Sequence, residues 1–232
     1  MALPKIESPK FVAVFPTGEE YSFRPFVVKE QKALLITSEG GSSLDIFKGI
    51  VDLVDKCTFE KIDWLSQPTV NLEHAFLHIR SKSVGEVVEI TYQCKSQHEG
   101  DKHCNHKNMI EVDVRTATSQ PFPENKISVT NSITMVMQHL TVKDTMDMMA
   151  GLSNEDLITR KVEMVIDGEN VITEFNKTEL MTFIDSFPTK AAEQLKSFFE
   201  DQPTLVLKQN TKCAKCGNES FIQLKGVLNF FG

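Results

Sequence analysis

The stretch TKCAKCGNES, residues 211–220, decides how distant parts of this chain meet, because it holds a C-x-x-C motif followed by Gly217. The apolar residues at 205–207 before the motif and at 222–224 after it are typical of strands. A turn of this kind between two strands presents two thiolates at the spacing that zinc requires. A structural zinc ion takes four ligands, so the motif predicts that a second ligand pair lies elsewhere in the sequence.

The second pair is predicted to be Cys94 and Cys104, in TYQCKSQHEGDKHCNHKNMI at residues 91–110. Residues 88–94 and 110–114 alternate between apolar and polar, which predicts a hairpin with both cysteines at its tip. Nine residues separate the two cysteines, where two to four are usual. His98 and His103 lie between them and His106 follows, so a histidine in place of Cys94 or Cys104 is an alternative. We favour four thiolates, because residues 97–102 can loop out.

The predicted ligand set of one structural zinc ion per chain is therefore Cys94, Cys104, Cys213 and Cys216. A redox motif of the thioredoxin type is disfavoured, because it opens a helix and the sequence after Cys216 is strand-like. A catalytic zinc ion keeps one position open for water, whereas four ligands are present here. Lys212 and Lys215 are expected to offset the negative charge of the thiolates.

Other candidate sites are weaker. Cys57 is the fifth cysteine and is expected to be an ordinary buried thiol. His74 and His78 have metal-ligand spacing on a predicted helix, but the H-E-x-x-H pattern is absent and ordinary half-buried histidines are expected. The sequence contains no nucleophile elbow, P-loop or dinucleotide fingerprint, so we expect no enzymatic activity.

The composition is that of a globular protein with a real core, at 232 residues, 41% hydrophobic and 25% charged. A formal net charge of −7 argues against broad binding to a phosphate backbone. Four lysines near the cysteines still leave a nucleic-acid-binding zinc ribbon as an alternative of another class: Lys102, Lys107, Lys212 and Lys215. No run of eighteen apolar residues and no signal peptide is recognised, so we expect a reducing compartment.

The predicted fold class is α+β, with small antiparallel sheets, a discontinuous zinc-ribbon-like element and a helical insert. Residues 1–86 are expected to form an N-terminal α/β part, and residues 87–116 with 204–232 the zinc-ribbon-like strand pairs. Residues 117–203 are expected to form a mostly helical insert, and the whole chain one compact unit.

The N-terminal part is expected to open with strands at 11–15 and 21–23, followed by a helix at 28–37. Ser43 is expected to cap an amphipathic helix that runs to about Lys56. Asn71 is expected to cap the next helix, with core positions at Leu72, Ala75, Phe76 and Ile79, and Gly85 to end it.

In the insert, residues 133–137 form a candidate short strand, with a helix as the alternative because the apolar run is dense. Ser153 is expected to cap a helix that continues through about Val165. A hairpin of residues 162–166 and 171–172 around Asp167-Gly168 is the alternative, and we favour the helix. Capping by Asn176 and Glu179 predicts a further helix, followed after Pro188 by a last helix that Pro203 stops.

Methionine clusters at 135–137 and 146–149 are interpreted as core packing, with an adaptable protein-binding surface as the alternative. The closing pair Phe230-Phe231 is interpreted either as a plug of the core or as a docking element.

Three N-terminal blocks carry a resemblance: MALPKI at 1–6, FPTG at 15–18 and RPFVVKEQK at 24–32. They resemble the T4-like bacteriophage baseplate protein family. Residues 79–86 (IRSKSVGE), 179–203 and 228–231 (LNFF) look similar to further blocks of that family. The resemblance covers nearly the whole chain, and the N-terminal blocks are its most specific part.

The resemblance implies a baseplate hub subunit or hub assembly protein that works by protein contacts. Implied partners are other baseplate hub and tail proteins, and also the tape measure protein. An assembly chaperone for the tape measure or another hub protein, not retained in the virion, is the alternative. The protein is expected in the host cytoplasm during assembly, and in the tail baseplate of the virion if it is a permanent part. An oligomer is compatible with this role.

Overall fold

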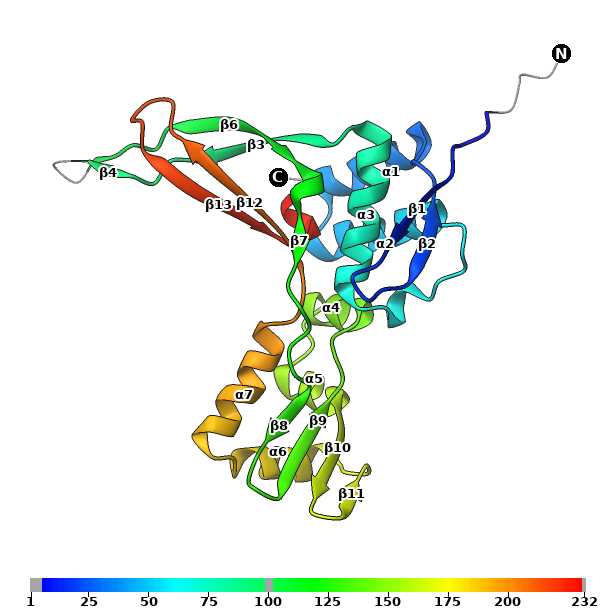
Figure 1. Ribbon diagram of the computed structural model, residues 1–232, viewed down its shortest axis with the longest axis vertical. Coiled ribbons are helices and arrows are strands. Elements are labelled where there is room, and N and C mark those ends of the chain that lie inside the picture. Colours follow the sequence, from blue (N-terminus) through cyan, green and yellow to red (C-terminus); the bar gives the residue numbers. More distant parts are fainter. Residues whose placement is uncertain (1–5, 99–101, 231–232) are drawn as a thin grey trace. The chain divides into compact units, whose positions relative to one another are not determined.

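The computed structural model describes residues 6–98 and 102–230, and it divides into two compact units (Figure 1). Unit 1 consists of Met1–Ile62, Val70–Ser119 and Thr204–Gly232, and unit 2 of Asp63–Thr69 and Gln120–Pro203. Helices are interspersed with small sheets whose neighbouring strands are all antiparallel in the described part of the chain. The α+β class with small antiparallel sheets is confirmed.

Unit 1 begins with a hairpin and three helices. Strands β1 (Phe11–Val14) and β2 (Glu20–Phe23) pair, and α1 (Val28–Gly40), α2 (Ser43–Cys57) and α3 (Thr69–Val84) follow. The apolar positions of α2 recur every three or four residues, so this helix buries one face, whereas α3 is buried on most sides between Val70 and Leu77. The buried side chains include Phe47, Ile50, Val54, Leu72, Ala75, Phe76 and Ile79.

The predicted N-cap residues of two helices are wrong, because both helices begin slightly earlier in the sequence than expected. The cap of α2 is Ser42, whose hydroxyl accepts from the Asp45 backbone N–H at 3.2 Å. Helix α3 begins at Thr69, so Asn71 lies inside it, and its side-chain amide donates to the Thr17 hydroxyl at 2.9 Å. A tertiary partner for the Asn71 amide thus replaces the local capping bond that the sequence suggested.

A buried carboxylate ties α3 to the C-terminal part of unit 1. Glu73 lies on α3 and accepts hydrogen bonds from the Leu205 backbone N–H at 2.8 Å and the Val227 backbone N–H at 3.1 Å. The Thr204 hydroxyl donates to the same carboxylate at 2.9 Å. These donors belong to the start of β12 (Leu205–Lys212) and of η3 (Val227–Phe230). Glu73 therefore fixes where the chain re-enters unit 1.

The rest of unit 1 is built from two long hairpins that lie side by side (Figure 1). Strand β3 (Val87–Gln93) pairs with β6 (Lys107–Asp113), and β12 pairs with β13 (Glu219–Lys225). Short strands β4 (Gln97–His98) and β5 (Lys102–His103) extend the first hairpin. Strand β7 (Thr118–Ser119) follows η2 (Val114–Thr116) and pairs with the beginning of β12.

The described part of unit 2 contains a four-stranded antiparallel sheet in the order β11-β10-β9-β8. Its strands are β8 (Lys126–Ser128), β9 (Ile133–Met137), β10 (Val162–Asp167) and β11 (Asn170–Ile172). The helical elements are η1 (Trp64–Ser66), α4 (Val142–Met149), α5 (Asn154–Lys161), α6 (Lys177–Asp185) and α7 (Thr189–Glu200). Sheet and helices share one apolar core of ten buried residues: Ile127, Val129, Met135, Met137, Val162, Val165, Leu180, Ala191, Leu195 and Phe198.

The predicted helix from Ser153 through Val165 is wrong in its second half. Ser153 does cap α5, but the helix ends at Lys161, and residues 162–167 form β10, which pairs with β9 and β11. The turn to β11 contains Gly168 at φ +57°. The β-branched side chains of β10 fit a pleated surface, and its pairing with β9 outweighs local helical continuation. Residues 117–203 are thus less helical than the sequence suggested.

The methionine clusters have different environments. Met135 and Met137 are fully buried in the core of unit 2, as core packing requires. Met148 and Met149 are exposed at the end of α4. Of the closing pair Phe230-Phe231, Phe231 lies outside the described residues.

In the described part of the chain, no helix combines the length and the apolar character needed to cross a membrane.

Candidate metal centre

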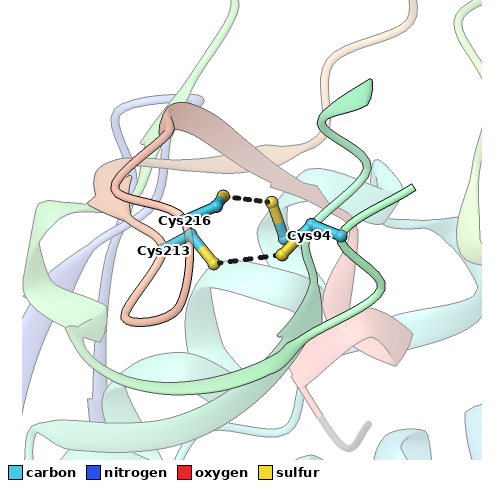
Figure 2. Close-up of side chains that lie close together, drawn as sticks. Cys94, Cys213 and Cys216 are labelled. Carbon is cyan, nitrogen blue, oxygen red and sulfur yellow. Dashed lines mark hydrogen bonds between the residues drawn. The ribbon is translucent and has the colours of Figure 1, made fainter. Parts of the chain in front are cut away.

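Four cysteines from the two hairpins of unit 1 converge on one point. The sulfur atoms of Cys94, Cys104, Cys213 and Cys216 all lie within 4.8 Å of one another. The Cys94 and Cys216 sulfurs are 3.7 Å apart, and those of Cys104 and Cys213 are 3.8 Å apart. Figure 2 shows Cys94 of the first hairpin facing the turn that carries Cys213 and Cys216. Each close pair therefore joins one hairpin to the other.

The turn after β12 holds its two cysteines by backbone hydrogen bonds. The Gly217 N–H donates to the Cys213 carbonyl at 2.9 Å, and the Cys213 N–H donates to the Asn218 carbonyl at 2.9 Å. Gly217 has φ +70°, a left-handed conformation that glycine adopts without steric cost. The chain reverses there and both thiol groups point to the same side. We call this turn, residues 213–218, the second knuckle.

The tip of the first hairpin has the same backbone arrangement. The Asn105 N–H donates to the Cys94 carbonyl at 3.1 Å, and the Cys94 N–H donates to the His106 carbonyl at 2.9 Å. Asn105 follows Cys104 as Gly217 follows Cys216, and it has φ +51°. We call residues 94–96 with 104–106 the first knuckle.

The segment between Cys94 and Cys104 accounts for the unusual spacing. The Cys104 N–H donates to the Ser96 carbonyl at 3.0 Å, which closes the loop that carries β4 and β5. Ser96 and Cys104 are therefore neighbours in space, as Lys215 and Cys216 are neighbours in sequence. The knuckle therefore keeps its ordinary shape, with the paired strands β4 and β5 inserted between Ser96 and Cys104.

Two of the three histidines considered as alternative ligands have described side chains. Among the described side chains, the metal-type cluster contains the four cysteines, and neither His103 nor His106 belongs to it. The side chain of His98, as well as Glu99 and Asp101, lies outside the described residues. The structure thus brings together the four cysteines that the sequence singled out.

The spacing of the sulfurs is compatible with a metal site. In a tetrahedral zinc site with zinc–sulfur bonds of about 2.3 Å, neighbouring sulfurs are about 3.8 Å apart. The two close sulfur pairs, at 3.7 and 3.8 Å, have this separation. Three of the cysteines are buried and Cys216 is half-buried, so solvent has little access to the sulfurs. The donor set is all thiol, which suits zinc and other soft cations.

The pKa values of the thiols differ, because each thiol has different hydrogen-bond partners. Hydrogen bonds from the Ser96 hydroxyl and the Asn218 N–H lower the pKa of Cys216 to about 5. The pKa of Cys104 is raised to about 11, since burial and the neighbouring thiols outweigh the bond from the His106 N–H. A divalent cation held by Cys94, Cys104, Cys213 and Cys216 would favour the ionised form of all four thiols.

Sequence reasoning missed three residues of the centre. Asn105 takes the left-handed position, and asparagine is one of the few residues other than glycine that tolerates it. Ser96 and Asn108 place polar atoms beside the sulfurs. Asn108 could have been noticed, because it occupies an inward position in β6, in line with Ile110 and Val112.

Other sequence candidates lie apart from the cysteines. His74 and His78 occupy consecutive turns of α3, with their Nε2 atoms 3.1 Å apart. Burial and the nearby His78 lower the pKa of His74 to about 4, so this half-buried ring is neutral at pH 7. Cys57 is buried at the end of α2, and burial raises the pKa of its thiol to about 12. Lys212 lies 3.9 Å from Glu219, and both side chains are exposed.

Comparison with known protein families identifies the family of this chain. Residues 8–232 match the family described as T4 bacteriophage base plate protein. The chain belongs to this family. The match includes both hairpins, both knuckles and all of unit 2, so it concerns the whole described architecture. No curated protein and no solved structure matches the chain significantly. Family membership assigns a structural or assembly role in a bacteriophage, with other phage tail proteins as partners and the tail as its place.

Proposed function

We propose that this protein acts in assembly of the phage baseplate hub, without catalysis, through contacts with other hub and tail proteins. The observation that carries the proposal is the family match over residues 8–232, which covers nearly the whole chain. A hub component needs a rigid body with defined surfaces. The candidate metal centre supplies rigidity to unit 1, because four side chains from two hairpins meet in it.

The same proposal includes one structural zinc ion, held by Cys94, Cys104, Cys213 and Cys216 as a zinc-ribbon-like element. The all-thiol donor set, the two matching knuckles and the separation of the close sulfur pairs support it. Four protein ligands fill a tetrahedral zinc site, so the ion would serve the fold. The chain's residues would bind and orient the ion, and the ion would supply the cross-link between the hairpins.

The hub role is tested by affinity purification of the tagged protein from infected cells, followed by mass spectrometry. We expect hub and tail proteins to be enriched over an unrelated tagged phage protein. Recovery without such proteins would overturn the proposal. Tight, salt-sensitive binding to unrelated DNA or RNA in a gel-shift assay would favour a nucleic-acid-binding zinc ribbon instead.

A chaperone for the tape measure or another hub protein is the second candidate, favoured by the exposed Met148 and Met149, since methionine suits adaptable binding surfaces. Purified virions distinguish the two roles. A hub subunit is present in finished particles at a fixed ratio to other baseplate proteins. A chaperone is enriched with its client in infected cells and absent from the particles.

A further inference from the structure

Four thiolates at the cysteine centre would need groups that stabilise their negative charge. Four thiolates around one divalent cation leave a net charge of −2, in a chain whose own formal charge is −7. Lys212 and Lys215, expected to offset this charge, are exposed, and Lys212 lies beside Glu219. Charged or ionised groups in a buried site need hydrogen-bond donors. Two polar side chains in the described part of unit 1 reach the sulfurs, Ser96 and Asn108.

Ser96 stands between the two hairpins. Its hydroxyl oxygen lies 3.1 Å from the Cys94 sulfur and 3.2 Å from the Cys216 sulfur. A thiolate has no proton to give, so beside ionised cysteines the hydroxyl is the donor. Cys94 belongs to the first knuckle and Cys216 to the second. The Ser96 hydroxyl therefore lies within hydrogen-bond distance of both sulfurs of the close pair that joins the hairpins.

Asn108 spans the hairpins from the other side. It is buried in β6, and its side-chain Nδ2 donates to the Cys213 sulfur at 3.5 Å and to the His106 carbonyl at 3.1 Å. Its Oδ1 accepts from the Ala214 backbone N–H at 2.8 Å. The side chain therefore binds the backbone of both knuckles and one of the candidate ligands.

We propose that Ser96 and Asn108 are positioning residues of the metal centre, which orient the thiolates of Cys213 and Cys216 and stabilise their negative charge. This inference rests on the proposed zinc site. Each residue belongs to the first hairpin and acts on the second, so the second knuckle is complete only when the first is docked against it. Metal binding and docking of the hairpins are then one cooperative event.

The test measures zinc affinity of the full chain by competition with a chromophoric chelator. Groups that orient metal ligands typically contribute about tenfold to a hundredfold in affinity. We expect Ser96→Ala and Asn108→Ala each to weaken zinc binding within this range, and Ser96→Thr to retain most of the affinity. Asn210→Ala is the matched control, because Asn210 is an exposed asparagine on β12, and it should bind zinc as the wild type does.

Asn108→Asp separates the two roles of the asparagine. Aspartate keeps an acceptor for the Ala214 N–H but has no N–H to donate to Cys213. If the bond to sulfur matters, Asn108→Asp binds zinc at least as weakly as Asn108→Ala. Wild-type affinity in Asn108→Asp would show that only the Ala214 contact counts and would overturn the charge-stabilising role.

Absorption of the cobalt-substituted protein gives a readout that folding alone does not move. Sulfur-to-cobalt bands report how the thiolates are placed, and we expect them to shift in Ser96→Ala while circular dichroism of the metal-loaded chain stays unchanged. Wild-type affinity and spectra in both alanine variants would overturn this inference and leave the zinc site intact. A wild-type chain that binds neither metal would instead overturn the zinc site itself.

Discussion

The sheet of unit 2 and the paired hairpins of unit 1 are stabilised in different ways. The sheet β8–β11 and helices α6 and α7 enclose ten buried apolar residues in one continuous core. The two hairpins share a small apolar cluster in which Val112 and Leu207 are the buried members. Burial of one large apolar side chain contributes about 1.5–3 kcal/mol, so this shared cluster contributes less to stability than the core of unit 2 does. We therefore expect the docking of the two hairpins to depend on the cysteine cluster, and the stability of unit 2 to be independent of it.

Removal of the metal should give the largest loss of stability, and this loss should be confined to the hairpins of unit 1. Structural zinc sites contribute about 10–16 kcal/mol in small zinc domains, so a chelator should unfold the hairpin pair. We expect amide hydrogen exchange to accelerate in β3, β6, β12 and β13 and to stay slow in β9, β10 and α7. Uniform behaviour of both regions would contradict the comparison.

The reverse experiment weakens unit 2 and leaves the cysteine centre untouched. Asp144 and Lys161 form a buried ion pair at 2.8 Å, and Asp144→Ala leaves the lysine buried and unpaired. Breaking such a pair costs about 3–5 kcal/mol. Trp64, the only tryptophan, is buried in unit 2, so its fluorescence during urea unfolding reports this loss.

Two controls test whether the effect of Asp144→Ala comes from the buried ion pair and is confined to unit 2. Asp147 forms a partly exposed ion pair with Arg160, and Asp147→Ala should cost less than about 1 kcal/mol. Zinc affinity should be the same in both aspartate variants. A change in zinc affinity that equals the loss of stability would show that the two regions are not separate.

Glu73 offers a pH-dependent test of how α3 holds β12. Burial raises the pKa of Glu73 above its ordinary value of 4.5, against the bonds from Leu205, Thr204 and Val227. A raised pKa means that the folded state binds the proton more tightly, so the contribution of Glu73 is complete below pH 4.5 and decreases as pH rises through the folded-state pKa. The unfolding free energy of the wild type minus that of Glu73→Gln should fall across this window. A difference that rises with pH would contradict the sign.

The smallest effect is expected from the exposed charges near the knuckles. Lys212→Ala removes an exposed ion pair with Glu219, which is worth at most about 1 kcal/mol. Zinc affinity should therefore change by no more than about fivefold. A larger loss would mean that lysine charge offsets the thiolates, in place of the hydrogen bonds from Ser96 and Asn108.

Much of this architecture follows from local sequence patterns. The C-x-x-C-G turn, the alternation on both sides of Cys94 and Cys104, and the capping signals of α5 and α6 each depend on residues close in the chain. They were sufficient to predict both hairpins and most helices. The four cysteines lie together as the zinc prediction requires, and the metal itself stays a prediction.

The features that sequence reasoning missed depend on residues far apart. Strand β10 is a strand because β9 lies some thirty residues earlier and pairs with it. Asn71 is a core residue because Thr17 faces it across the unit. The Ser96 hydroxyl lies beside the Cys216 sulfur although the two residues are 120 positions apart in the chain. No local pattern encodes the Asn71–Thr17 and Ser96–Cys216 contacts, whereas the Asp167-Gly168 turn signal did offer the β10–β11 hairpin as an alternative, which the structure confirms.

The most direct test is native mass spectrometry of the purified wild-type chain beside Cys213→Ser and Cys216→Ser. The two cysteines lie in one knuckle of unit 1, and neither belongs to the core of unit 2. We predict one zinc ion per wild-type chain, and little or no zinc in either variant. Wild-type protein that carries no zinc and gains none on addition of the ion, yet has fully protected hairpins, would contradict the account.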